Sequence, residues 1–281
     1  MNSTFWSSTI WYVLLGITTF LELVIILIKV KDRKHVISLF LTISGITFIC
    51  FEMAILMCFK AYVYYPKIFS NQHDDSVVGN LFSQFSVTSS AILITLLNLR
   101  FYWYFLIAAV YAVIEELFVH LGIYKQNWYQ TWMTFIGLLS LFWITKRINH
   151  IMLKNFGRVW RYLFIFLGLC TLHLHTITWA FKVIGIRKLN ECLLTDNDCS
   201  IVVIAGIYML VLGIISLIIY FTNIKWTWKI GGICILYLAH YIAEQYQLLM
   251  SAKGSFFIST TISIWGMFLY IFILDWLYPK S

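Results

Sequence analysis

Carboxylate and imidazole side chains recur at helical spacing inside apolar segments of the sequence. Glu116 and His120 are four positions apart in "YAVIEELFVHLGIY", and His240 and Glu244 show the same spacing in reverse order in "YLAHYIAEQYQLL". Residues at i and i+4 share one face of a helix. A glutamate can act as a general base on water, and imidazoles with carboxylates suit zinc or another transition metal. The pattern therefore indicates proton transfer or metal binding.

Two neighbouring pairs leave a choice open. Glu115 and Glu116 project about 100° apart on a helix, so only one of them is expected to meet the face of His120 squarely. His173 and His175 in "CTLHLHTIT" diverge in a similar way. The candidate site consists of the acid–base residues Glu115, Glu116 and Glu244 and the metal ligands His120, His173 and His240.

Membrane helices are the elements that must position these residues. Of the 281 residues, 61% are hydrophobic and only 11% are charged, whereas a soluble domain carries about 25% charged residues. Strand-like alternation is absent, which argues against a barrel. We expect one integral membrane domain over 1–281, an all-α bundle of about nine spans, with eight as the alternative count. Apolar runs long enough to cross a bilayer lie near 10–30, 36–59, 78–99, 101–122, 129–145, 162–184, 201–222, 230–250 and 256–277.

The charge of the loops predicts the orientation. The chain has 20 Lys and Arg residues and a net charge of +8, but these residues lie in short loops between spans, which argues against a nucleic-acid groove. Most of them fall on the side that holds segments 29–34, 146–161 and 225–229, and the side richer in Lys and Arg is cytoplasmic. We therefore expect a multi-pass protein of the cell membrane with its N-terminus outside and its C-terminus in the cytoplasm.

This orientation brings the ionisable residues to one depth. A charged group at mid-span costs about 2.5–3.5 kcal/mol on the insertion scale, so pairing, protonation, water or a metal must offset the cost. Glu52, His175 and the candidate residues lie between the membrane centre and the outer leaflet, which favours one shared site. Glu22 lies deeper and fits less well. The alternative is a polar network that only holds the helices together.

Three further segments carry expectations of their own. The basic segment "KRINHIMLKNFGRVWR" (146–161) predicts an interfacial helix on anionic lipids, with a solvated loop as the alternative. Cys192 and Cys199 lie in an outer loop where an oxidising exterior permits a disulfide. The other cysteines lie in apolar spans and are expected in the core. The polar third span, "NLFSQFSVTSS", predicts either close helix packing or the lining of a cavity.

The quoted motifs resemble two families. "SVVGNLFSQFSVTSSAILI" and "VIEELFVHLGIYKQNWYQTWMT", within residues 76–135, resemble an uncharacterised multi-pass membrane family of spore-forming Firmicutes. That resemblance implies a bacterial membrane protein and no mechanism. "EELFVH" is more weakly similar to the Glu-Glu-x-x-x-Arg motif of CAAX-type intramembrane proteases, with His120 in place of Arg. The Phe-x-x-x-His motif of those proteases is missing, and Glu244 stands where they have Asn or Asp.

Three functional hypotheses follow. The first is an intramembrane hydrolase-like enzyme acting on a lipid or membrane peptide, with Glu115 or Glu116 as the general base and a divalent metal such as zinc as a candidate cofactor. The second is a proton-coupled transporter, against which counts the lack of a clear internal repeat in the sequence. The third is a non-catalytic membrane partner or sensor.

Overall fold

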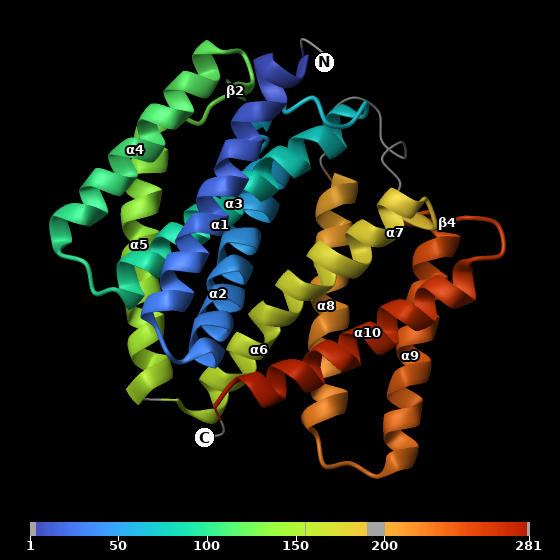
Figure 1. Ribbon diagram of the computed structural model, residues 1–281. Coiled ribbons are helices and arrows are strands. Elements are labelled where there is room, and N and C mark those ends of the chain that lie inside the picture. The colour runs from blue at the N-terminus through green and yellow to red at the C-terminus, as the bar shows by residue number, and fades with distance from the viewer. Residues whose placement is uncertain (1–3, 155, 190–199, 280–281) are drawn as a thin grey trace. The chain divides into compact units, whose positions relative to one another are not determined.

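The protein is an all-α helical bundle, as the sequence predicts. The computed structural model describes residues 4–154, 156–189 and 200–279, and these divide into two compact units, Met1–Phe156 and Gly157–Ser281 (Figure 1). This division was not expected from the sequence. In the described residues a helix covers each of the nine predicted spans, and six of the helices are long and apolar enough to cross a membrane.

The described part of the first unit consists of seven helical segments and two short strands. Its elements are η1 (Phe5–Thr9), α1 (Ile10–Lys29), α2 (Arg33–Thr47), η2 (Phe48–Cys58), β1 (Tyr62–Tyr64), α3 (Gln72–Leu96), α4 (Phe101–His120), β2 (Tyr124–Gln126) and α5 (Thr131–Lys154). The η segments are wider π-type turns that continue a neighbouring helix. α3 packs against α1, α2 and α5, so its polar residues face other helices.

A small antiparallel pair closes one end of the first unit. Tyr62 pairs with Gln126 and Tyr64 with Tyr124, so β1 and β2 join the loop before α3 to the loop before α5. Tyr12 of α1 donates a hydrogen bond from its hydroxyl to the carbonyl oxygen of Ile123 at 2.6 Å. The tyrosines around this pair form a buried cluster. Aromatic packing therefore holds the ends of the helices together at this end of the first unit.

The second unit has the same kinds of elements. They are α6 (Arg158–His173), η3 (Leu174–Thr178), α7 (Trp179–Ile184), β3 (Arg187–Leu189), α8 (Ser200–Phe221), α9 (Trp226–Gln245), β4 (Leu249–Ser251) and α10 (Phe256–Leu277). α6 packs against α8 and α10, and β3 pairs with β4 in antiparallel register, Arg187 opposite Ser251.

The two units repeat one element order. After α1, each has a long helix, a strand, two helices, a second strand and a last helix. Equivalent positions lie 125 residues apart, from Tyr62 to Arg187 in the first strand and from Gln126 to Ser251 in the second. The helices α4 and α9 keep this spacing at both their first and their last residues.

Loop backbone confirms the repeat. Left-handed residues end equivalent helices: Lys60 corresponds to Gly185, and Gly122 to Gln247. Backbone hydrogen bonds in the loops also recur at this spacing. The bond from Asn127 N to Ala61 O corresponds to that from Ala252 N to Ile186 O. In the same way, Ile123 N to Phe118 O corresponds to Leu248 N to Ala243 O, and Trp103 N to Arg100 O corresponds to Trp228 N to Lys225 O. The fold therefore contains a repeat that is not clear in the sequence. Few equivalent positions share a residue type, because many apolar side chains serve equally well on a membrane helix.

Two smaller expectations also need correction. Segment 146–161 is not a separate interfacial helix, because residues up to Lys154 continue α5 and Arg158 begins α6. Of the cysteines expected in the core, Cys170 is buried, but Cys50, Cys58 and Cys234 are exposed on their helices. Cys192 and Cys199 lie outside the described residues.

Candidate functional site

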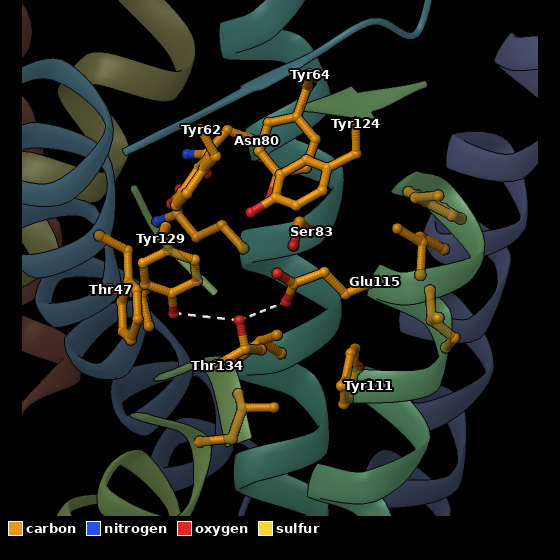
Figure 2. A pocket seen from close by; sticks show the side chains of 17 residues that line it. Thr47, Tyr62, Tyr64, Asn80, Ser83, Tyr111, Glu115, Tyr124, Tyr129 and Thr134 are labelled. Carbon is orange, nitrogen blue, oxygen red and sulfur yellow. Dashed lines mark hydrogen bonds between the residues drawn. The ribbon is translucent and has the colours of Figure 1, made fainter. Parts of the chain in front are cut away.

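A pocket with both apolar and polar lining residues lies inside the first unit, between α3, α4, α5 and the β1–β2 pair. Its volume is about 90 Å³, room for roughly three water molecules at their share of liquid volume. Figure 2 shows the Glu115 carboxylate pointing into the space between Ser83, Thr134 and the tyrosine rings. Glu115 is thus the member of the Glu115–Glu116 pair that faces a site.

Hydrogen-bond donors from α5 and the β2 strand hold the Glu115 carboxylate in place. Gln126 of β2 donates from Nε2 to Oε1 at 2.8 Å, and the Thr134 hydroxyl of α5 donates to Oε2. Thr134 is also hydrogen-bonded to the Tyr129 hydroxyl at 3.2 Å (Figure 2). Among the described residues no Lys, Arg or His forms an ion pair with Glu115. The carboxylate is oriented by neutral donors and has no counter-charge from this part of the chain.

Two amide side chains of α3 line the pocket with unused hydrogen-bonding atoms. Asn80 is 3% exposed and Gln84 is 6% exposed. Among the described residues, the Nδ2 of Asn80 and the Oε1 of Gln84 have no hydrogen-bond partner, although Gln84 Nε2 donates to the Ser44 carbonyl oxygen at 2.9 Å. A buried polar atom without a partner costs about 1–3 kcal/mol. Each unpartnered atom in the wall of a pocket therefore calls for an explanation.

Tyrosine rings form the other walls. The centroid of the Tyr62 ring lies 5.4 Å from that of Tyr124 and 5.3 Å from that of Tyr129, and Tyr64 and Tyr124 are 4.8 Å apart. Burial, and then the nearby Glu115 charge, raise the pKa of Tyr129 to about 12, against the opposing hydrogen bond from Thr134. Burial also raises the pKa values of Tyr64 and Tyr124. All three phenols are neutral at physiological pH.

The other predicted residues of the first unit lie away from this pocket. Glu116 is exposed and accepts a hydrogen bond from the Thr131 hydroxyl. His120 is exposed at the end of α4. The i,i+4 pair therefore lies on the outer face of α4. The side chain of Glu52 lies outside the described residues.

The remaining predicted residues belong to the second unit. His173 and His240 are buried, 3% and 1% exposed. His173 Nε2 lies 3.1 Å from Ser263 Oγ, and His240 Nδ1 lies 2.9 Å from the carbonyl oxygen of Leu236. Glu244 accepts a hydrogen bond from Ser251 at 3.1 Å. His173, not His175, is the buried member of its pair; His175 Nδ1 lies 2.8 Å from the Thr171 carbonyl oxygen.

A zinc site is not assembled in the described part of the chain. No group of three or more His, Cys, Asp or Glu side chains is close enough there to hold a metal ion. His120 belongs to the first unit, whereas His173 and His240 belong to the second and are hydrogen-bonded to neutral partners. The zinc prediction, and the prediction of one site shared by all these residues, rest on the sequence alone.

A second carboxylate network joins α1 to α3 and α4. Glu22 accepts hydrogen bonds from the hydroxyls of Ser89 and Ser90, the latter at 2.6 Å. Tyr111, which also lines the pocket, lies 2.7 Å from Ser86 Oγ and 2.9 Å from Ser90 Oγ. The run "SVTSS" carried the signal for this network, because two of its hydroxyls, of Ser89 and Ser90, bind one carboxylate. The same helix lines the pocket with Asn80, Ser83 and Gln84, so both expectations for the polar third span are met.

Comparison with known proteins adds no assignment to this geometry. The resemblances to a Firmicutes membrane family and to CAAX-type proteases remain predictions from the quoted motifs. No protein-family model, curated protein or solved structure matches this chain.

Proposed function

We propose that this chain is a carrier of the cell membrane that binds a proton or a small cation at Glu115 in the pocket of the first unit. One observation carries the proposal: a pocket inside the first unit holds a half-buried carboxylate that has no cationic partner in the described residues. A carboxylate in a low-dielectric site is stabilised by taking up a proton or a cation. Binding and release at such a group is the elementary step of coupled transport.

The repeat supports a carrier. Many transporters consist of two repeats with binding sites formed by their helices. Each unit here has four long helices after α1, and four spans return the chain to the side of the membrane on which it began. The absence of a visible repeat was the sequence-based argument against transport, and the repeat removes that argument.

Flux through reconstituted protein tests the proposal. Proteoliposomes containing a pH-sensitive dye receive an inward gradient of protons or of ammonium. We expect wild-type flux above empty liposomes, flux at the empty-liposome level for Glu115→Gln, and wild-type flux for Glu116→Gln. The two variants make the same chemical change one residue apart, but only Glu115 faces the pocket. Wild-type flux in Glu115→Gln would exclude the proposal.

A hydrolase is the second candidate, and one observation favours it. The space beside Glu115 is large enough for water, so the carboxylate can act as a general base on a water molecule that attacks a lipid ester or membrane peptide. This chemistry predicts product release from a fluorogenic lipid ester by detergent-purified protein, lost in Glu115→Gln. Flux of protons or ammonium in proteoliposomes, without hydrolysis of the lipid ester, would favour transport over hydrolysis.

We also propose that the basic ends of α5 and α6 contact anionic lipids. Lys154 and Arg158 lie at these ends and are exposed. In the orientation that we propose they face the cytoplasmic headgroups, where each Lys or Arg contributes about 1 kcal/mol of attraction to anionic lipids.

A further inference from the structure

In the second unit, a cationic side chain, Arg187, stands among the residues that correspond to those around Glu115 in the first unit. The spacing of the repeat places Arg187 at the position of Tyr62, His240 at that of Glu115, and Ser251 at that of Gln126. In the first unit Tyr62 and Glu115 line the pocket, and Gln126 binds Glu115. The second unit thus has a guanidinium among the counterparts of the residues that surround Glu115.

Arg187 is fixed in this place by neutral oxygen atoms and an aromatic ring. It is 7% exposed. Its Nη2 donates to Thr260 Oγ1 at 2.5 Å and to the Phe256 carbonyl oxygen at 3.4 Å, and its Nε donates to Ser251 Oγ at 3.3 Å. Its Cζ lies 5.9 Å from the centroid of the Phe256 ring, within the range of a cation–π contact. Ser251 in turn donates to Glu244.

The charges of the two places are complementary. The first unit has an anion, Glu115, and no cation paired with it among the described residues. In the second unit an imidazole replaces that anion: His240 Nδ1 must carry a hydrogen, because its partner, the Leu236 carbonyl oxygen, can only accept. Burial lowers the pKa of Arg187, an effect that Tyr208 and Glu244 oppose.

We infer that the pocket of the first unit binds an organic cation with N–H donors, of the guanidinium or primary ammonium type, and that Arg187 permanently occupies the equivalent place in the second unit. The inference rests on the proposed cation site at Glu115 and names its ligand. Glu115 supplies the counter-charge, the unused Gln84 Oε1 accepts an N–H, and the tyrosine rings supply cation–π surface. The chain accordingly binds one such cation.

Equilibrium binding of guanidinium to detergent-purified protein, far below denaturing concentrations and at constant ionic strength, tests this inference. We expect one saturable site in the wild type, lost in Glu115→Gln and retained in Glu116→Gln. Tetramethylammonium, which has the charge but no N–H donor, should bind more weakly by about tenfold or more. Absence of saturable guanidinium binding, or binding that survives Glu115→Gln, overturns the inference.

Variants of Arg187 test the second place separately. Arg187→Ala leaves the Glu244 carboxylate, which is bonded to the Arg187 partner Ser251, without its cation and should raise the stoichiometry from one guanidinium to two, whereas Arg187→Lys keeps a resident cation and should leave one. Arg187→Gln, which retains a donor for Thr260 without the charge, takes the place of Arg187→Ala if that variant does not fold. If Arg187→Ala or Arg187→Gln folds and still binds only one guanidinium, Arg187 does not occupy a second cation-binding position. Proton flux that depends on Glu115, without guanidinium binding, leaves the carrier proposal standing and removes only this inference.

Discussion

The clearest distinction at the scale of single residues is between two adjacent glutamates. Glu115 and Glu116 have the same chemistry and adjacent positions, and the sequence leaves open which of them faces a site. The structure places Glu115 in the pocket and Glu116 on the exposed face of α4. Helix phase predicts that the two diverge, but only the packing of α3 and α5 against α4 decides which one is enclosed. The spacing of residues within α4 does not show how other helices pack against it.

The buried tyrosines predict a loss of stability in alkaline solution. The pKa of Tyr129 in the folded protein, about 12, lies above its ordinary value of 10.0. Folding therefore favours the protonated phenol, and this contribution is fully present below pH 10 and is lost as the pH rises through 12. Tyr129 accounts for about 2 kcal/mol of that loss. Thermal unfolding in detergent between pH 8 and pH 12 measures it.

Tyr129→Phe provides the control, because it removes the titrating hydroxyl and retains the ring. The variant should lose less stability than the wild type between pH 10 and pH 12, while Tyr64 and Tyr124 still titrate in both proteins. Identical pH profiles for the two proteins would show that Tyr129 titrates normally.

At the scale of elements, α3 organises the first unit. One part of this helix lines the pocket with Asn80 and Gln84, and the next turns bind Glu22. Close packing of β1 on α3 depends on Gly79. A Cβ at this position would lie 2.5 Å from the Tyr64 Cβ, a contact that forces β1 away from α3.

Gly79→Ala should therefore lower the stability of the protein. We expect a loss of about 1–3 kcal/mol from the overpacking, larger than the helix-propensity gain of about 1 kcal/mol for Gly to Ala. Gly137→Ala in α5 is the matched control, because its Cβ would meet only Phe51 atoms at 3.6 Å, an ordinary contact. Thermal unfolding in detergent should show a lower midpoint for the first variant and an unchanged or higher midpoint for the second. A midpoint for Gly79→Ala equal to that of Gly137→Ala would mean that β1 does not pack closely on α3.

The elements were predictable to different degrees. Long apolar runs fix the helices, because a bilayer demands both length and internal hydrogen bonding. The strands β1 to β4 were not predicted: each has three residues, too few for an alternating pattern. The basic stretch around Lys154 was wrongly assigned to a separate helix, since charge alone does not mark where α5 ends.

At the scale of the whole molecule, the repeat lies in spacing and not in residue identity. Lipid-facing positions accept any large apolar side chain, so equivalent helices share composition without sharing sequence. What recurs is the helix length, the left-handed residues at helix ends and the strand register. The site could be predicted only in part, because Glu115 has a charged side chain that stands out in an apolar span, whereas the tyrosines Tyr62, Tyr64 and Tyr124 resemble ordinary interface aromatics.

The repeat and the loop charges predict a definite orientation. In a background with Cys192 and Cys199 replaced by Ser, a cysteine at Lys125, in the exposed part of β2, should react with a membrane-impermeant maleimide in intact cells. A cysteine at Lys154, in the exposed last turn of α5, should react only after permeabilisation. The opposite labelling pattern would reverse the orientation and place the β1–β2 end of the pocket toward the cytoplasm.

The central claim is that the Glu115 carboxyl is the group that meets the cation, and infrared difference spectroscopy on reconstituted protein tests it most directly. Adding guanidinium or a proton pulse should change a carboxyl band in the wild type and in Glu116→Gln, because Glu115 passes between its protonated and its cation-paired state. The same addition should leave that band absent from the difference spectrum of Glu115→Gln. A carboxyl band that persists in Glu115→Gln at wild-type intensity would contradict the account.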